Sequence, residues 1–180
     1  MKLLLHICCG PCLIYPLKAL RAEGFSVDGY FYNPNIHPYT EFKARMEAME
    51  KYAASEGLRV ASEVGYDMEE FLRRAVRHED DRCGSCYEMR LRKTAQCAKD
   101  SGYDAFTSTL LYSKYQNHDL IVQIADVLAR DIGIEFMYQD FREGWREGQE
   151  TSRVIGMYRQ KYCGCIYSEK ERFLKAAVRS

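Results

Sequence analysis

The residues of this sequence that could do chemistry are its cysteines, because they are grouped rather than scattered. Seven of the eight cysteines fall in three short segments: Cys8-Cys9-Gly10-Pro11-Cys12, Cys83-Gly84-Ser85-Cys86 and Cys163-Gly164-Cys165. Thiols that only fill a core would be spread among the helices and strands. Thiols clustered in this way are typical of a metal centre or a redox site.

The clustered thiols outnumber the ligands of one metal ion. A tetrahedral zinc site takes about four ligands. Seven thiolates therefore fit one four-thiolate 4Fe–4S cluster and a second, three-coordinate metal with an open position, where a substrate oxygen can bind as to a Lewis acid. Two alternatives stay open. Eight thiolates would suit two zinc sites or two cubane clusters, and one CxxC pair alone would suit half of a structural zinc site or an isolated redox pair.

The charge of such a centre requires cations nearby. A four-thiolate cluster would carry about −2 and a three-thiolate divalent ion about −1, so the sum is about −3. The candidate counter-cations are Arg82, Arg90, Arg142, Arg153 and Arg159. For each of them the alternative is an ordinary solvated surface charge.

The backbone around the thiols carries expectations of its own. In an extended chain Cys8 and Cys9 point apart and serve different metals; the alternative for this pair is a vicinal disulfide. Gly10 and Gly164 are expected to let the backbone turn so that the neighbouring thiolates converge. Cys97 stands alone in a predicted helix and is expected to be a packing residue.

Several other positions have a structural interpretation, a functional one, or both. His37 lies at a predicted strand edge, where it contacts substrate or shapes the loop. Asp81 precedes the second cysteine segment, where it supplies an oxygen ligand or caps a helix. Tyr112 and Tyr115, with Gln116, could stack on and hydrogen-bond a nucleobase, or the tyrosines could serve as packing residues. His6, inside the first predicted strand, is expected to be a core histidine with satisfied hydrogen bonds.

The elements that must position these residues alternate between strands and helices. Apolar or alternating runs predict strands at 2–8, 25–32, 58–64, 105–111 and 134–138. Amphipathic runs predict helices at 13–23, 39–56, 67–78, 87–99, 117–131, 149–160 and 168–178. This alternation predicts an α/β, Rossmann-like fold, with a mostly parallel sheet covered by helices on both faces.

The predicted topology also places the thiols. In such a sheet the ligand crevice lies outside the carboxyl ends of the strands. The first cysteine segment directly follows the first strand, so we expect it in that crevice, together with the loops after Tyr32, Leu111 and Tyr138. We predict one α/β domain over residues 1–180, with metal-binding loops at 8–12, 81–86 and 163–165.

Length and composition exclude several classes of protein. The 180 residues, of which 47% are hydrophobic, supply a core for about one domain, and no apolar run approaches the ~20 residues that cross a bilayer. The run from Met1 to Cys8 is too short for a signal peptide, so a reducing, cytoplasmic location is expected. Lys and Arg number 26, as do Asp and Glu. A uniformly basic protein is excluded, but a local basic patch for nucleic acid is not.

Four segments together resemble one known family. They are Cys8-Cys9-Gly10-Pro11-Cys12, Asn33-Pro34-Asn35-Ile36-His37-Pro38, Asp81-Arg82-Cys83-Gly84-Ser85-Cys86-Tyr87 and Tyr158-Arg159-Gln160-Lys161-Tyr162-Cys163-Gly164-Cys165. In this order and spacing the sequence resembles the QueH-type epoxyqueuosine reductases over nearly the whole chain. The segment from Ser108 to Gln116 also looks familial, with Lys114 where a proline is expected.

The resemblance implies an oxidoreductase that completes queuosine in tRNA. The epoxide of epoxyqueuosine, at the wobble position of the anticodon, becomes an alkene as two electrons and two protons enter and water leaves. The resemblance also implies a 4Fe–4S cluster beside a second metal, iron with zinc as the alternative, and no cobalamin. The implied partners are tRNA carrying epoxyqueuosine and an external electron donor, with no membrane involved. The implied fold is a HUP-like nucleotide-binding sheet.

Residue roles follow as a hypothesis. Cys9, Cys83, Cys86 and Cys165 would hold the cluster, whereas Cys8, Cys12 and Cys163 would hold the second metal, with Asp81 assisting. The catalytic candidates for the proton donor are Asp81, His37 and Tyr115.

Two other functions compete with this one. A zinc-stabilised RNA-binding module without catalysis would use the same thiols and would be colourless. An ATP-using tRNA modification enzyme is disfavoured, because no Ser-Gly-Gly-type phosphate loop follows the first strand and no GxxxxGK[ST] segment is present. Basic residues for tRNA, or ordinary helix faces, are Arg73, Arg74, Arg77, Arg90, Arg92 and Lys93 in the middle, and Arg142, Arg146, Arg153, Arg159 and Lys161 near the end.

Overall fold

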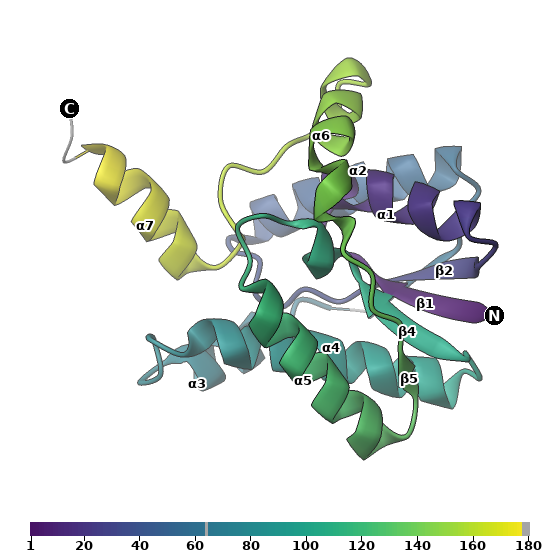
Figure 1. Cartoon of the computed structure of the whole chain (residues 1–180). Helices are drawn as coiled ribbons and strands as arrows, with labels where there is room; N and C mark the ends of the chain where they lie inside the picture. The colour runs from purple at the N-terminus through teal and green to yellow at the C-terminus, as the bar shows by residue number, and fades with distance from the viewer. Residues whose placement is uncertain (64, 178–180) are drawn as a thin grey trace.

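A five-stranded parallel sheet forms the centre of the protein (Figure 1). The computed structural model describes residues 1–63 and 65–177, with side chains up to residue 174. The strands are β1 (Lys2–His6), β2 (Ser26–Phe31), β3 (Val60–Ser62), β4 (Ala105–Ser108) and β5 (Glu135–Phe136), in the order β3-β2-β1-β4-β5 with every neighbouring pair parallel. This confirms the predicted Rossmann-like α/β class.

Helices cover both faces of the sheet, as predicted. The helices α1 (Gly10–Ala22), α2 (Tyr39–Ser55) and α6 (Trp145–Val154) lie on one side, and α3 (Met68–Ala75), α4 (Arg82–Asp100) and α5 (His118–Ile132) lie on the other (Figure 1). The last helix, α7 (Ile166–Ala177), stands away from the sheet. None of the helices in the described part of the chain is both long and apolar enough to span a membrane.

The central strand β1 is apolar because it is covered on both faces. Leu3, Leu4 and Leu5 are at most 1% exposed, which is typical of an inner strand of a parallel sheet with helices on either side. The core therefore lies between the sheet and its two helical layers.

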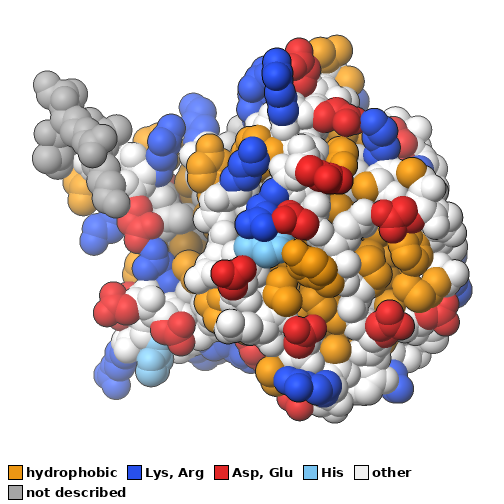
Figure 2. Space-filling view, viewed as in Figure 1, with side chains coloured by type: hydrophobic (Ala, Val, Ile, Leu, Met, Phe, Trp, Pro, Cys, Tyr) orange, Lys and Arg blue, Asp and Glu red, His pale blue; other side chains and the backbone are white. Residues whose placement is uncertain are grey.

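Acidic and basic side chains are interspersed over the viewed surface (Figure 2), in keeping with a net charge of zero.

The strand order creates a crevice at the carboxyl ends of β1 and β4. The chain leaves β1 toward β2 on one side and later returns to place β4 on the other side of β1. Adjacent parallel strands whose connections run in opposite directions leave an opening there, where α/β proteins bind ligands. The backbone N–H of Cys8, just beyond β1, donates a hydrogen bond to Oγ1 of Thr109, just beyond β4, over 3.0 Å. The first cysteine segment therefore lies where the topology predicted it.

Several predicted boundaries are wrong for identifiable reasons. The strand predicted at 105–111 ends at Ser108, whose hydroxyl accepts a hydrogen bond from the N–H of Leu110 over 3.1 Å and starts the 3-10 helix η1 (Thr109–Tyr112). Leu110 and Leu111 are buried, so their apolar run marks core packing in a turn rather than a strand. The strand predicted at 58–64 covers only Val60–Ser62, and residue 64 lies outside the described residues.

Helix boundaries differ as well. The helix predicted at 149–160 is α6 (Trp145–Val154), which ends because Gly156 adopts a left-handed φ of 64°. The helix predicted from residue 87 already begins at Arg82. The helix predicted at 168–178 is α7 (Ile166–Ala177), and residue 178 lies outside the described residues. A second 3-10 helix, η2 (Phe141–Gly144), precedes α6.

Candidate metal centre

Three cysteines at the end of β1 form a compact group, which we call the triad. The sulfurs of Cys8, Cys9 and Cys12 all lie within 4.8 Å of one another. The Cys8 and Cys9 sulfurs are 3.7 Å apart, so the expectation that these side chains point apart is wrong. The chain bends at Cys8 instead of continuing as a strand, and α1 begins at Gly10. The bend and the first helical turn bring the three thiols together.

The glycines beside these thiols act in two different ways. Gly164 adopts a φ of 151°, which only glycine adopts without strain, so it allows the turn between Cys163 and Cys165 as expected. Gly10 has ordinary helical geometry, and its role is close packing: a Cβ there would lie 2.7 Å from Sδ of Met157 and 3.1 Å from the backbone oxygen of Ala48. All eight cysteines are free thiols, so no vicinal disulfide forms.

The triad sulfurs cannot all ionise without help. Hydrogen bonds from the thiols of Cys12 and Cys9 hold the pKa of Cys8 well below its ordinary value. The hydrogen bond with Cys8 in turn raises the pKa of Cys12, and burial raises the pKa of Cys9. The protein alone thus favours one thiolate among three sulfurs. Three thiolates at these positions would need a bound cation to offset their charge.

A second group of thiols, which we call the quartet, comprises Cys83, Cys86, Cys163 and Cys165. Cys83 and Cys86 lie in the first turn of α4, and Cys163 and Cys165 immediately precede α7. Burial raises the pKa of Cys86 to about 12, and the nearby Cys163 thiol contributes to that rise. Burial, followed by the charge of Cys163, also raises the pKa of Cys83. Geometry also links the two pairs, because Gln116 accepts a hydrogen bond from the hydroxyl of Tyr87, next to Cys86, over 2.7 Å and donates one to the sulfur of Cys163 over 3.2 Å.

The loop that carries Cys163 is fixed by buried polar groups. Arg45 donates hydrogen bonds to the backbone oxygens of Cys163 and Tyr162 over 2.7 and 3.0 Å, and its own charge is paired with Glu41 at 2.7 Å. The backbone N–H of His37 donates to the backbone oxygen of Gly164 over 2.8 Å. The segment around α2 therefore holds this loop, together with Ser168 of α7, whose hydroxyl accepts a hydrogen bond from the N–H of Gly164 over 3.2 Å.

The triad opens into a pocket of about 670 Å³, within the range of small-molecule sites, about 300–1,000 Å³. Three thiols reach it: Cys8, Cys12 and Cys163. The other lining residues are mostly aromatic, amide and basic: Tyr115, Trp145, Tyr162, Phe173, Gln116, Gln149, Gln160, Arg45, Arg90, Arg159, Lys161 and Arg172. The first and third cysteine segments thus share one cavity with aromatic, amide and basic side chains.

Two glutamine amides contact the sulfurs from across this pocket. Nε2 of Gln160 donates to the sulfur of Cys9 over 3.0 Å and approaches that of Cys12 at 3.8 Å. Nε2 of Gln116 donates to the sulfur of Cys163 over 3.2 Å. No individual role was predicted for Gln160 or Trp145. The signal for Gln160 in the sequence was its place in the segment from Tyr158 to Cys165.

The three candidate proton donors lie in different environments. Tyr115 is 85% exposed and lines the pocket, and its ring meets that of Trp145 edge to face with the ring centroids 5.5 Å apart. His37 is 3% exposed, and its ring nitrogens face the backbone oxygen of Pro34 at 3.1 Å and the N–H of Ile166 at 3.4 Å. Asp81 is exposed at the N-cap position of α4, although its side chain makes no capping hydrogen bond.

The remaining singled-out residues are structural. His6 is fully buried between the Ser108 hydroxyl at 2.9 Å and the Tyr32 backbone oxygen at 3.2 Å, which confirms a core histidine. Tyr112 is fully buried against Trp145 and is not available to a nucleobase. Cys97 packs against the core.

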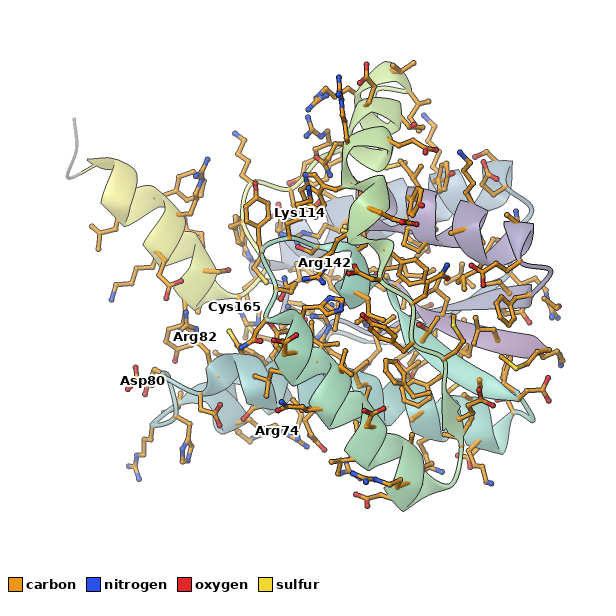
Figure 3. The ribbon with its side chains drawn as sticks, in the orientation of Figure 1. Arg74, Asp80, Arg82, Lys114, Arg142 and Cys165 are labelled. Atoms are coloured by element: carbon orange, nitrogen blue, oxygen red, sulfur yellow. The ribbon has the colours of Figure 1, made fainter. Side chains whose placement is uncertain are left out.

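The candidate counter-cations divide by position. Arg90 and Arg159 line the pocket. Arg82 is paired with Glu171 and lies close to Cys165, where α4 meets α7 (Figure 3). Arg142 is held by two hydrogen bonds to Asp140, of 2.8 and 2.6 Å, away from the pocket. Arg153 is exposed.

Comparisons with known proteins show which family this chain belongs to. The family model described as "Epoxyqueuosine reductase QueH" matches residues 3–171. Epoxyqueuosine reductase QueH of Dehalococcoides mccartyi is 42% identical over 97% of this chain and 96% of that protein. The protein of the same name from Thermotoga maritima is 36% identical over 97% of this chain and 93% of its own length.

One solved structure shares the fold. It is a predicted subunit of tRNA methyltransferase from Methanocaldococcus jannaschii, with a TM-score of 0.58, 12% identity, and coverage of 85% of this chain and 74% of that one. At this identity the likeness concerns the fold alone. The family match and the two relatives carry the assignment, and by them the chain belongs to the epoxyqueuosine reductase QueH family of oxidoreductases.

Proposed function

We propose that this protein reduces the epoxide of epoxyqueuosine to the alkene of queuosine at the wobble position of tRNA. Two carbon–oxygen bonds break and one carbon–carbon double bond forms. The carbons accept two electrons from an external donor, and the oxygen leaves as water with two protons. The observation that carries the proposal is the opening of the thiol triad into a pocket lined by aromatic and basic side chains, in a chain of this family.

We propose that the quartet holds a 4Fe–4S cluster and that the triad holds a second metal, iron with zinc as the alternative. The donor sets fit, because one group has four thiols and the other has three within 4.8 Å. Compared with the sequence-based hypothesis, Cys9 and Cys163 exchange places. When bound, such groups supply single electrons and a Lewis acid for an oxygen atom.

The chain itself would orient the substrate and supply a proton. Tyr115 is the one of the three donor candidates that lines the pocket. We therefore assign its hydroxyl as the group that donates a proton to the departing oxygen. The rings of Tyr115 and Trp145, which meet edge to face, offer an aromatic wall for an unpaired base. His37 would act on the reaction only through the loop of Cys163 to Cys165, which its backbone N–H holds.

The rim of the pocket would contact the phosphates that flank the modified nucleotide. Arg159, Lys161 and Arg172 are exposed there, and Lys114 lies beside Tyr115 on the loop before α5 (Figure 3). Among the basic residues in the middle of the sequence, from Arg73 to Lys93, Arg74 and Arg92 are instead paired with Glu88. Ion pairing on α4 makes that group a less suitable phosphate site than the pocket rim.

The experiment is an anaerobic turnover assay. The chain is loaded with iron and sulfide, mixed with tRNA carrying epoxyqueuosine and dithionite, and the digested nucleosides are analysed by mass spectrometry. The expected product is queuosine, which lacks one oxygen atom of the substrate. A loaded, brown protein that leaves the epoxide intact would contradict the proposal. A colourless protein with two zinc ions that only binds RNA would support the non-catalytic alternative.

A further inference from the structure

Arg90 is a buried cation that has no acidic partner among the described residues. It lies in α4, one turn after Cys86, and is 2% exposed. Its Nη2 donates to Oδ1 of Asn33 over 2.7 Å, and its Nη1 points to the sulfur of Cys86 at 3.8 Å. Its Nε has no hydrogen-bond partner among the described residues. A fully buried guanidinium in this state is strongly unfavourable unless an anion lies nearby.

Arg45 is a buried arginine comparable to Arg90, but its charge is compensated within the protein. Its side chain is equally buried, at 2% exposed, but it pairs with the carboxylate of Glu41 at 2.7 Å and donates to two backbone oxygens. No ion pair in the described part of the chain includes Arg90. The contrast indicates that the anion for Arg90 is not a carboxylate.

Among the described residues, the groups near Arg90 that could carry negative charge are sulfurs. Its Nη1 lies 3.8 Å from the sulfur of Cys86, which belongs to the quartet. Arg90 also lines the pocket that Cys8 of the triad and Cys163 of the quartet reach. It therefore faces sulfurs of both groups.

A second buried residue fixes the direction of the guanidinium. Asn33 is 1% exposed, and its Nδ2 donates to the backbone oxygen of Ile7 over 2.9 Å while its Oδ1 accepts from Arg90. Because Ile7 lies between β1 and Cys8, this bridge ties Arg90 to the segment that carries the triad. The Asn33 amide binds Nη2, so Nη1 of the guanidinium remains free to face the sulfur of Cys86.

We infer that Arg90 is the buried counter-cation shared by the triad and the quartet, and that it positions and electrostatically tunes whatever metal groups those thiolates hold. This inference rests on the proposed thiolate centres. A fixed positive charge beside a redox group favours its reduced form, because an added electron is attracted to that charge. It also favours retention of the metal, because it keeps the thiolates ionised.

The test compares Arg90→Met, Arg90→Gln and Arg90→Lys with Arg92→Met in the full chain, after anaerobic loading with iron and sulfide. Arg92 lies on the same helix with its side chain 49% exposed, so it controls for loss of an arginine from α4. We expect the neutral Arg90 variants to show a lower midpoint potential and to release iron to a chelator about 10- to 100-fold faster. Arg90→Lys keeps the charge and should remain closer to wild type, as should Arg92→Met.

Thermal unfolding of the metal-free full chain distinguishes this role from plain packing. Removing an uncompensated buried charge should leave the unfolding temperature of Arg90→Met equal to or above that of wild type. Destabilisation without metal, combined with unchanged potential and iron release when loaded, would overturn the inference. Equal potentials for the Gln and Lys variants would overturn it too, and this comparison holds even if the Met variant fails to fold.

The proposed function and the role of Arg90 can fail separately. If wild type reduces epoxyqueuosine while the neutral variants keep its potential and iron release, only the role of Arg90 is refuted. If wild type binds iron but leaves the epoxide intact, the proposed function is refuted, and a lower potential in Arg90→Gln still supports the counter-cation.

Discussion

The side-chain amide of Gln160 donates a hydrogen bond to the sulfur of Cys9 over 3.0 Å. This contact joins the segment before α7 to the start of α1, although 151 positions separate the two residues. An amide N–H directed at a thiolate stabilises its charge and orients the ligand. Two segments that are distant in the sequence therefore meet at the triad.

Replacing Gln160 should weaken the triad without unfolding the protein. In Gln160→Ala we expect metal bound at the triad to be held about 10- to 100-fold less tightly, because Cys9 loses its external hydrogen bond. A competition assay with a chelator measures this, with the exposed Gln96→Ala on α4 as the control. Equal retention in both variants would show that the amide contact has no influence on the metal.

Single cysteine variants test how the thiols are divided between the two groups. In Cys9→Ala we expect loss of the second metal with the cluster absorbance retained, since Cys9 belongs to the triad. In Cys163→Ala we expect the cluster to be lost. Iron and sulfide counts with visible spectra report both. The reverse pattern would restore the original sequence-based hypothesis, in which Cys9 binds the cluster and Cys163 the second metal.

Two variants of Tyr115 distinguish proton donation by its hydroxyl from base stacking on its ring. Tyr115→Phe keeps the ring but lacks the hydroxyl, so kcat should fall about 10²- to 10⁴-fold with little change in KM. Tyr115→Ala should in addition raise KM, by the loss of about 1–3 kcal/mol of base stacking. Steady-state kinetics on the modified tRNA measure both. Tyr39→Phe, at a tyrosine that is 53% exposed and absent from the pocket lining, is the control. Unchanged kcat in Tyr115→Phe would exclude the hydroxyl as the donor.

Asp140 should make part of the stability depend on pH. Hydrogen bonds from Arg142 lower the pKa of Asp140 from 3.8 to about 2. A lowered carboxyl pKa stabilises the fold fully above about pH 3.8, and this contribution is lost as pH falls through about 2. Asp140→Asn should therefore unfold at a lower temperature than wild type near neutral pH, and the gap should narrow below about pH 4. A gap that is independent of pH would contradict this.

The same residue separates a charge effect from a capping effect. Oδ1 of Asp140 also accepts the backbone N–H of Arg142 over 3.0 Å, which caps η2. An asparagine retains that cap, whereas Asp140→Ala loses it at a cost of about 1 kcal/mol. We expect the extra destabilisation of the alanine variant to persist at all pH values, as measured by thermal unfolding.

Binding of tRNA should depend on a few rim cations. Each phosphate contact contributes about 0.7 to the slope of log affinity against log salt for single-stranded nucleic acid. Lys161→Ala should therefore reduce that slope by about 0.7, whereas Lys51→Ala, on the exposed part of α2, should not. Salt titrations of tRNA binding give both slopes. Identical slopes would place the tRNA elsewhere on the protein.

The sequence by itself determined the fold class and the set of chemical residues. Alternation of apolar strands with amphipathic helices is a local property, so it predicted the parallel sheet, and the position of Cys8 after β1 predicted its place in the crevice. The clustering of seven cysteines is also a local property of the sequence, so it predicted a thiol centre. Boundaries failed where a local pattern had two meanings, as with the buried Leu110 and Leu111 in η1.

Only the tertiary structure decided which thiols stand together. The sequence predicted that Cys8 and Cys9 point apart as in an extended chain, but the bend into α1 brings their sulfurs to 3.7 Å. Likewise, nothing in the local sequence distinguishes the buried Arg90 from the exposed Arg92 two positions later. Burial and through-space contacts depend on how distant elements pack, and they decide whether a charge is solvated or must find its partner within the protein.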